Sequence, residues 1–179
     1  MSMYRLFKSC LAVFTISAGL SAAPAAHAER GPATPEEQAR VIALAAVADK
    51  DPLAAMTSPE GRWFMKWSDD VPDYNFGPDK GAFLLMNNAK GDLRRVVRFQ
   101  HDLSSAVFQL EHQIHDPQKN PADFDAKTIA ALKGLLHAYE TMLTTHPDIR
   151  APQLDEAIAA RDKGTLADFV KALPPMPPR

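Results

Sequence analysis

Two histidines and a glutamate at helical spacing are the side chains of this sequence best placed to bind a metal. Glu111, His112 and His115 are close in sequence, and imidazoles one helical turn apart can chelate one divalent ion. The competing interpretation is a solvated helix face, because these histidines and His101 fall opposite the apolar seam of the same predicted helix. His101 would stand about 16 Å from His112 along that helix, too far to join the site. We expect no resident cofactor, with a divalent metal as the alternative.

Aromatic and acidic side chains gather at 62–81, among prolines and glycines that exclude a long helix. Trp63 and Trp67 lie four residues apart, so their rings share a side of one helical turn. Exposed, such rings stack on a sugar or anchor a protein partner. The alternative is that they fill the core at one end of a helical bundle. The candidate binding residues of this segment are Trp63, Trp67, Asp69, Asp70, Asp73, Tyr74 and Phe76.

A basic patch follows at Arg94, Arg95 and Arg98. Arginines four residues apart project from one side of a helix and can hold an anionic group or a carboxylate. The alternative is a solvated face on which they pair with neighbouring acids. Arg94 and Arg98 are the candidate anion-binding residues.

Sequence signatures of catalysis are absent. The chain has no G-x-S-x-G elbow, no Walker loop, no G-x-G-x-x-G and no H-E-x-x-H motif. The aspartates between Asp69 and Asp79 do not match the spacing of a calcium-binding loop. We therefore expect a protein that acts by binding rather than by catalysing a reaction.

The elements that must position these residues are predicted to be helices. In two segments joined by a loop, apolar residues recur at alternating spacings of three and four, which is typical of helices packed on each other. Asp92 can cap the first helix, which runs to about His115, and together the two helices predict an antiparallel hairpin. The seam residues are Leu93, Val96, Gln100, Leu103, Val107, Leu110 and Ile114 in the first helix, and Ile129, Leu132, Leu136, Tyr139 and Leu143 in the second.

Shorter helices are predicted on both sides of this hairpin. Thr34 and Glu37 form a capping box for a helix that continues to about Asp49, and Asp51 begins a short one that Pro59 and Gly61 interrupt. The further expected elements are one turn at 63–67, an irregular connection, and short helices near 82–87, 153–162 and 166–173. No segment alternates polar and apolar residues as a strand does. The predicted fold is all-α, an irregular bundle around the central hairpin.

The N-terminus predicts export. A short basic region, an apolar run at 11–20 and the small residues Ala26 and Ala28 match a secretory signal peptide cleaved after Ala28. Cleavage would remove Cys10, the only cysteine, and no later apolar run is long enough to cross a bilayer. We expect a periplasmic or secreted protein with one helical domain at 29–173 and a proline-rich tail at 174–179.

Composition narrows the class of partner. The chain has 179 residues, with 20 basic and 22 acidic side chains and a formal net charge of −2, so charge gives no reason to bind nucleic acid. The expected partner is another envelope or secreted protein, bound as an inhibitor, an immunity-type protein or an assembly factor. The alternatives are the metal site, and a glycan or small ligand stacked on exposed tryptophans.

Overall fold

The computed structural model describes residues 30–77, 84–87 and 89–173. Regular structure in these ranges is entirely helical, which confirms the all-α class. The predicted signal peptide at 1–28 and the proline-rich tail at 174–179 lie outside the described residues. Within those ranges, no helix combines the length and the apolar character needed to traverse a bilayer.

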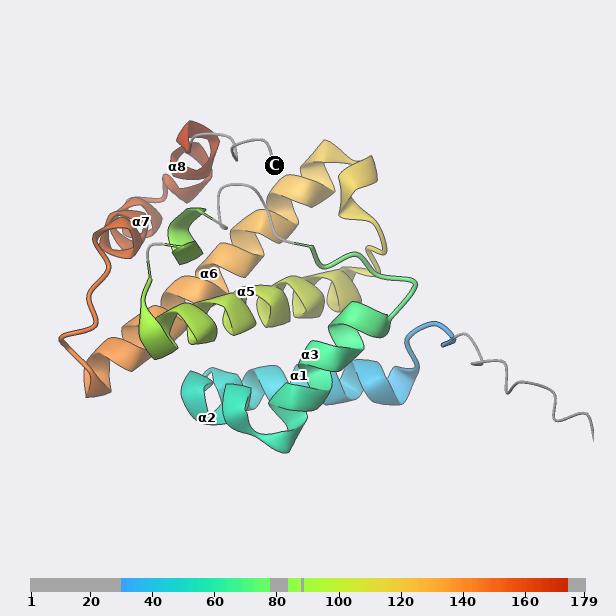
Figure 1. Cartoon of the computed structure of the whole chain (residues 1–179). Coiled ribbons are helices and arrows are strands. Elements are labelled where there is room, and N and C mark those ends of the chain that lie inside the picture. The colour runs from blue at the N-terminus through green and yellow to red at the C-terminus, as the bar shows by residue number, and fades with distance from the viewer. Residues whose placement is uncertain (1–29, 78–83, 88, 174–179) are drawn as a thin grey trace, which may run out of the picture.

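Helices α5 (Gly91–His112) and α6 (Pro121–Thr145) form the centre of the molecule. They cross obliquely with opposed chain directions, as the colour gradient of Figure 1 shows. Seam residues such as Leu103, Leu136 and Tyr139 are fully buried. A Cβ added to Gly134 would lie 1.9 Å from Oγ of Ser104, so the glycine of α6 leaves room for this side chain of α5.

Three helices cover α5 on one side: α1 (Pro35–Ala48), α2 (Pro52–Thr57) and α3 (Pro59–Asp70). The capping box of Thr34 and Glu37 is present as expected, and the short helix expected from Asp51 is α2, which the Asp51 carboxylate caps. The prediction of a single turn at 63–67 is wrong, because α3 extends over 12 residues. Ser58 caps this helix and Pro59 occupies its first position, where a proline begins a helix instead of ending it.

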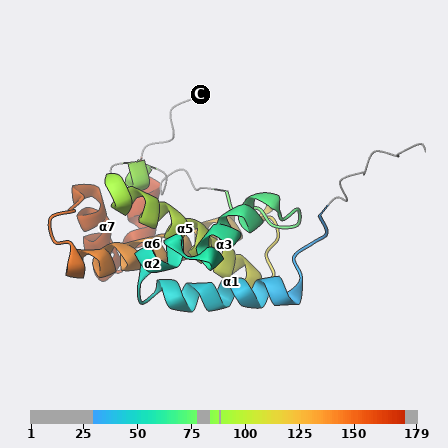
Figure 2. The same ribbon diagram turned by 60° about the horizontal axis from the view of Figure 1, so that its bottom comes forward.

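Short elements on both sides of α6 in the chain pack against it. The 3-10 turn η1 (Pro117–Lys119) precedes α6, and α7 (Pro152–Asp162) and α8 (Leu166–Ala172) follow it. Figures 1 and 2 place α7 and α8 beside α6, away from α1. Two polar contacts tie α7 to α6: the Tyr139 hydroxyl donates to Asp155, and Arg161 forms a two-pronged ion pair with Glu140.

The boundaries of α5 differ from the prediction. Lys90, not Asp92, is the residue before the first turn, and the helix ends at His112 instead of His115. It ends there because Gln113 adopts a left-handed backbone with φ of 54°, which turns the chain away from the helix axis. His115 therefore leaves the face that His112 occupies.

His101 corrects a second prediction. Its side chain lies opposite the seam that faces α6, yet it is fully buried. The solvated-face interpretation is wrong for this residue because α5 is covered around most of its circumference. The buried residues of α5 are Leu93, Val96, Val97, Phe99, Gln100, His101, Leu103, Ser105, Ala106, Gln109 and Leu110.

Candidate functional site

The aromatic side chains of 63–76 form one continuous ladder of rings. Ring centroids lie 5.8 Å apart for Trp63 and Trp67, 5.4 Å for Trp67 and Phe76, and 5.6 Å for Phe76 and Tyr74. Of these four side chains, Trp67, Tyr74 and Phe76 are buried, and Trp63 is partly exposed. The interpretation of these rings as an exposed platform is therefore wrong for Trp67, Tyr74 and Phe76, which pack on each other and on the core.

A cation covers the outer end of this ladder. The guanidinium carbon of Arg40 lies 3.8 Å from the ring centroid of Trp63, and an ion pair with Glu60 holds the arginine in place. Such a cation over an indole face is favourable by about 0.5–1 kcal/mol at an exposed site. Arg40 thus occupies a face of the one indole that the ladder leaves partly exposed.

The other end of the ladder is held by His115. Its imidazole stacks on Tyr74 with centroids 4.4 Å apart, and Nδ1 donates to the carbonyl oxygen of Asp73 at 2.8 Å. The backbone N–H of Asn75 donates in turn to the carbonyl of His115 at 3.0 Å. The Asp73 carboxylate accepts from the N–H of Ala33 at 2.9 Å. These contacts fix residues 71–77, called the connection from here on, between α1 and the end of α5.

A cavity of about 340 Å³ lies between the connection, the end of α3 and the outer side of α5. We call it the connection groove. Its volume is at the lower end of the range for small-molecule sites. It brings together residues that the sequence singled out from two separate segments, an acidic one and a basic one. Its lining residues are Ser68, Asp69, Val71, Tyr74, Asn75, Phe76, Gly77, Arg98 and Asp102.

Charges of both signs line the connection groove. Arg98 is exposed and forms no ion pair with any residue of the described ranges. Asp102 accepts a hydrogen bond from Nδ1 of the buried His101 at 3.0 Å, which orients its carboxylate. The Asp69 side chain has no hydrogen-bond partner in the same ranges. Among the described residues, the groove therefore offers the guanidinium of Arg98 and carboxylate oxygens to a molecule that enters it.

Tyr74 lines the groove, and its hydroxyl is buried. That hydroxyl has no hydrogen-bond partner among the described residues. Burial raises the pKa of the hydroxyl, and the neighbouring Asp73 carboxylate raises it further. Tyr74 is therefore a neutral phenol at ordinary pH.

The predicted metal site is not formed. Nδ1 of His112 bonds to the carbonyl of Phe108 at 2.8 Å, and its ring stacks on that phenylalanine. His115 is engaged with the connection instead, because the chain turns at Gln113. In the part of the chain that the structure describes, no three His, Cys, Asp or Glu side chains are grouped so that they could hold a metal ion. The alternative of a metal site at Glu111, His112 and His115 is therefore wrong.

Two other candidate residues lie away from the groove. Asp70 forms an ion pair with Lys66 one turn before it on α3, and Arg94 donates to the side chain of Asn87 at 3.3 Å. Arg94 is exposed, as the solvated-face interpretation of the basic patch expects. The groove residues that were not candidates from the sequence are Ser68, Val71, Asn75, Gly77 and Asp102. Asp102 had a detectable signal, since it stands four residues after Arg98 and therefore shares its side of the helix.

No protein-family model, curated protein or solved structure matches the chain.

Proposed function

We propose that the protein acts by binding a partner protein at the connection groove. The observation that carries the proposal is the position of Arg98, an exposed guanidinium at the edge of a groove of about 340 Å³, without an ion pair in the described ranges. A guanidinium presents a planar fork of donors that suits a carboxylate in two-point contact.

The chemistry of the groove describes the segment that would fit. Arg98 favours a carboxylate, and the oxygens of Asp69 and Asp102 favour N–H donors. An extended segment of a partner carries both, as an acidic side chain and its neighbouring backbone amides. The ring ladder contributes a rigid support below this surface and is not itself the contact. A rigid site loses less conformational entropy on binding than a mobile loop.

Site-specific crosslinking tests this proposal. A photoreactive amino acid replaces Asn75, which lines the groove, and in a control protein it replaces Lys133, an exposed residue of α6. In cells that produce the protein, we expect one partner to be crosslinked from position 75 and not from position 133. Arg98→Gln should reduce this product at least about fivefold, as expected for loss of a charged hydrogen bond, while Arg94→Gln leaves it unchanged.

Two results would contradict the proposal: crosslinking from position 75 that does not exceed the control, or a product that does not respond to Arg98→Gln. A small ligand at the same site would give no crosslinked protein, although Arg98→Gln would still weaken its binding.

Export is part of the same proposal, since the predicted partner is an envelope or secreted protein. The supporting feature is the signal-peptide pattern at 1–28. Mass spectrometry of the protein recovered outside the cytoplasm should find Glu29 as its first residue. An intact N-terminus in that fraction would contradict this step.

A further inference from the structure

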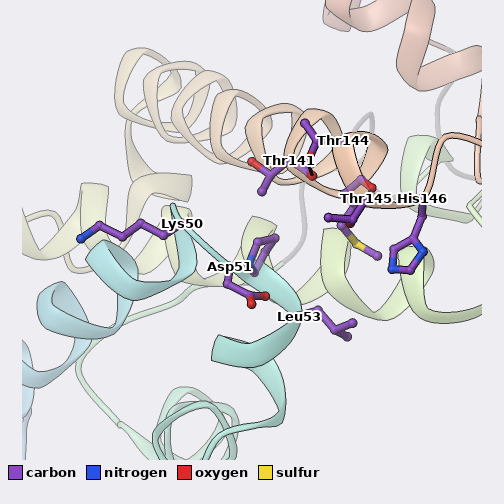
Figure 3. A pocket seen from close by; sticks show the side chains of 9 residues that line it. Lys50, Asp51, Leu53, Thr141, Thr144, Thr145 and His146 are labelled. Carbon is purple, nitrogen blue, oxygen red and sulfur yellow. Dashed lines mark hydrogen bonds between the residues drawn. The ribbon is translucent and has the colours of Figure 1, made fainter.

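A second cavity, of about 300 Å³, lies on another part of the molecule, where the link between α1 and α2 meets the C-terminal end of α6 (Figure 3). We call it the threonine groove. Threonines and Met142 near the end of α6 line one wall, and α2 and the residues before it line the other. Its lining residues are Lys50, Asp51, Pro52, Leu53, Thr141, Met142, Thr144, Thr145 and His146.

Each threonine hydroxyl of this groove already donates a hydrogen bond to a backbone carbonyl of α6. Thr141 donates to the carbonyl of His137 at 3.0 Å, Thr144 to that of Thr141 at 2.7 Å, and Thr145 to that of Met142 at 3.2 Å. A hydroxyl has one proton and two lone pairs, so each oxygen is left as an acceptor. This wall of the groove therefore accepts hydrogen bonds and donates none from these side chains.

Asp51 adds a negative charge to the same groove. One carboxylate oxygen accepts from the N–H of Ala54 at 2.9 Å as the cap of α2. The second oxygen has no hydrogen-bond partner within the described ranges. Figure 3 shows Asp51 on the opposite side of the groove from Thr141 and Thr144, and Lys50 extending away from all of them.

Two helix ends add to the negative potential. Helices α1 and α6 both finish at this groove, at Ala48 and Thr145, and neither has a basic residue in its last turn. The C-terminal end of a helix carries a partial negative charge that attracts cations. One backbone carbonyl at the end of α1 already has a partner, because Nε2 of His137 donates to the carbonyl oxygen of Asp49 at 3.1 Å. Pro52, Leu53 and Met142 supply apolar surface beside these acceptors.

We propose that the threonine groove binds a primary ammonium group carried on an alkyl chain. Such a group has three N–H donors and a positive charge, which match the hydroxyl oxygens and the open oxygen of Asp51. Its methylene groups contact Pro52, Leu53 and Met142. A free amine and the lysine side chain of a peptide carry this same chemistry.

Titration with n-butylammonium, followed by amide chemical shifts, tests the proposal. At pH 8, where an ordinary imidazole is neutral, we expect saturable shifts at Asp51, Thr141 and Thr144 with an affinity of about a millimolar, as suits so small a ligand. n-Butanol has the same chain without the charge, and tetramethylammonium has the charge without N–H donors. Both should bind at least about fivefold more weakly, since each lacks part of the charged hydrogen bonding.

Asp51→Asn is the decisive variant, because asparagine also caps a helix well and the fold is retained. It should weaken n-butylammonium binding at least about fivefold through loss of a charged acceptor. Asp116→Asn is its matched control, since Asp116 caps η1 in the same way outside the threonine groove. This control should bind as the unmodified protein does.

Three results would overturn the proposal: absence of saturable shifts, equal binding of n-butanol, or full binding by Asp51→Asn. Cadaverine and Nα-acetyl-lysine methylamide distinguish the two sources of the ammonium group, because the tighter of the two identifies a free amine or a lysine side chain.

Discussion

Two buried tyrosine hydroxyls have opposite surroundings, and the difference decides what each contributes to stability. The Tyr139 hydroxyl accepts from the backbone N–H of Ala151 at 2.9 Å and donates to Asp155 at 3.0 Å. The Tyr74 hydroxyl has no hydrogen-bond partner in the described part of the chain. A buried polar group without a partner costs the free energy of its lost hydration, whereas a paired one recovers it.

Removing the two hydroxyls should therefore have opposite effects. We expect Tyr139→Phe to lower the free energy of unfolding by about 1–3 kcal/mol, because the buried N–H of Ala151 loses its partner. Tyr74→Phe should leave it unchanged or raise it by up to about 1 kcal/mol. Urea denaturation followed by circular dichroism measures both. A loss of stability in Tyr74→Phe as large as that in Tyr139→Phe would contradict the assignment of an unpartnered hydroxyl.

At the level of elements, α7 is attached to α6 by a charged pair. Both terminal nitrogens of Arg161 donate to Glu140, at 2.6 Å and 2.8 Å. These hydrogen bonds lower the pKa of the Glu140 carboxyl below its ordinary value of 4.5, against the opposing effect of burial. The Glu140 side chain is 40% exposed, so solvent screens the pair.

This pair predicts a pH-dependent contribution to stability. The pKa of Glu140 is lower in the folded than in the unfolded protein, so the contribution is complete above about pH 4.5 and is lost as the pH falls through the lower folded value. At pH 7 we expect Glu140→Gln to lower the free energy of unfolding by about 1 kcal/mol after allowance for screening. Denaturation at pH 7 and pH 3 should show this difference become smaller on acidification.

The matched control is Glu156→Gln, which removes an exposed carboxylate of α7 that has no ion pair in the described ranges. It should change stability little at either pH. If Glu140→Gln were equally destabilising at pH 3, lost packing and not lost charge would be the cause.

For the molecule as a whole, the sequence predicted the elements better than their surroundings. The capping residues Thr34 and Asp51 place two helix starts correctly because capping is a local interaction. The burial of Leu103 and Leu136 follows from seam spacing. A seam describes only one neighbour of a helix, however. Since α5 is covered on further sides, the burial of His101 could not be read from its angle to that seam.

The candidate site was only partly predicted, because its residues come from separate segments whose packing the sequence pattern does not show. Arg98 and Asp69 stand out in sequence and meet in the connection groove, but their proximity depends on how the connection folds back across α5. That path is set by His115, which leaves its helix only because Gln113 takes a left-handed backbone. A glutamine gives no local signal for such a conformation, unlike a glycine. The metal alternative is wrong because the backbone of Gln113 turns His115 away from His112.

The ring ladder leads to a prediction about the cooperativity of unfolding. Trp67 of α3 is 2% exposed and stacks on Phe76 of the connection, while Phe64 of α3 meets Phe99 of α5 edge to face at 5.8 Å. The buried apolar residues of α1, α3, α5 and α6 belong to one cluster. The helices before the connection therefore share their core with the central pair and should not unfold separately.

The variant Trp63→Phe tests this cooperativity, because it leaves Trp67 as the single tryptophan and keeps an aromatic ring under Arg40. In urea, the emission of Trp67 reports on the contact of α3 with the connection, and circular dichroism reports on all helices. We expect the two signals to change at the same midpoint, as in a two-state transition. A fluorescence change at clearly lower urea would mean that α1–α3 separate first, and that the floor of the connection groove is less stable than the central pair.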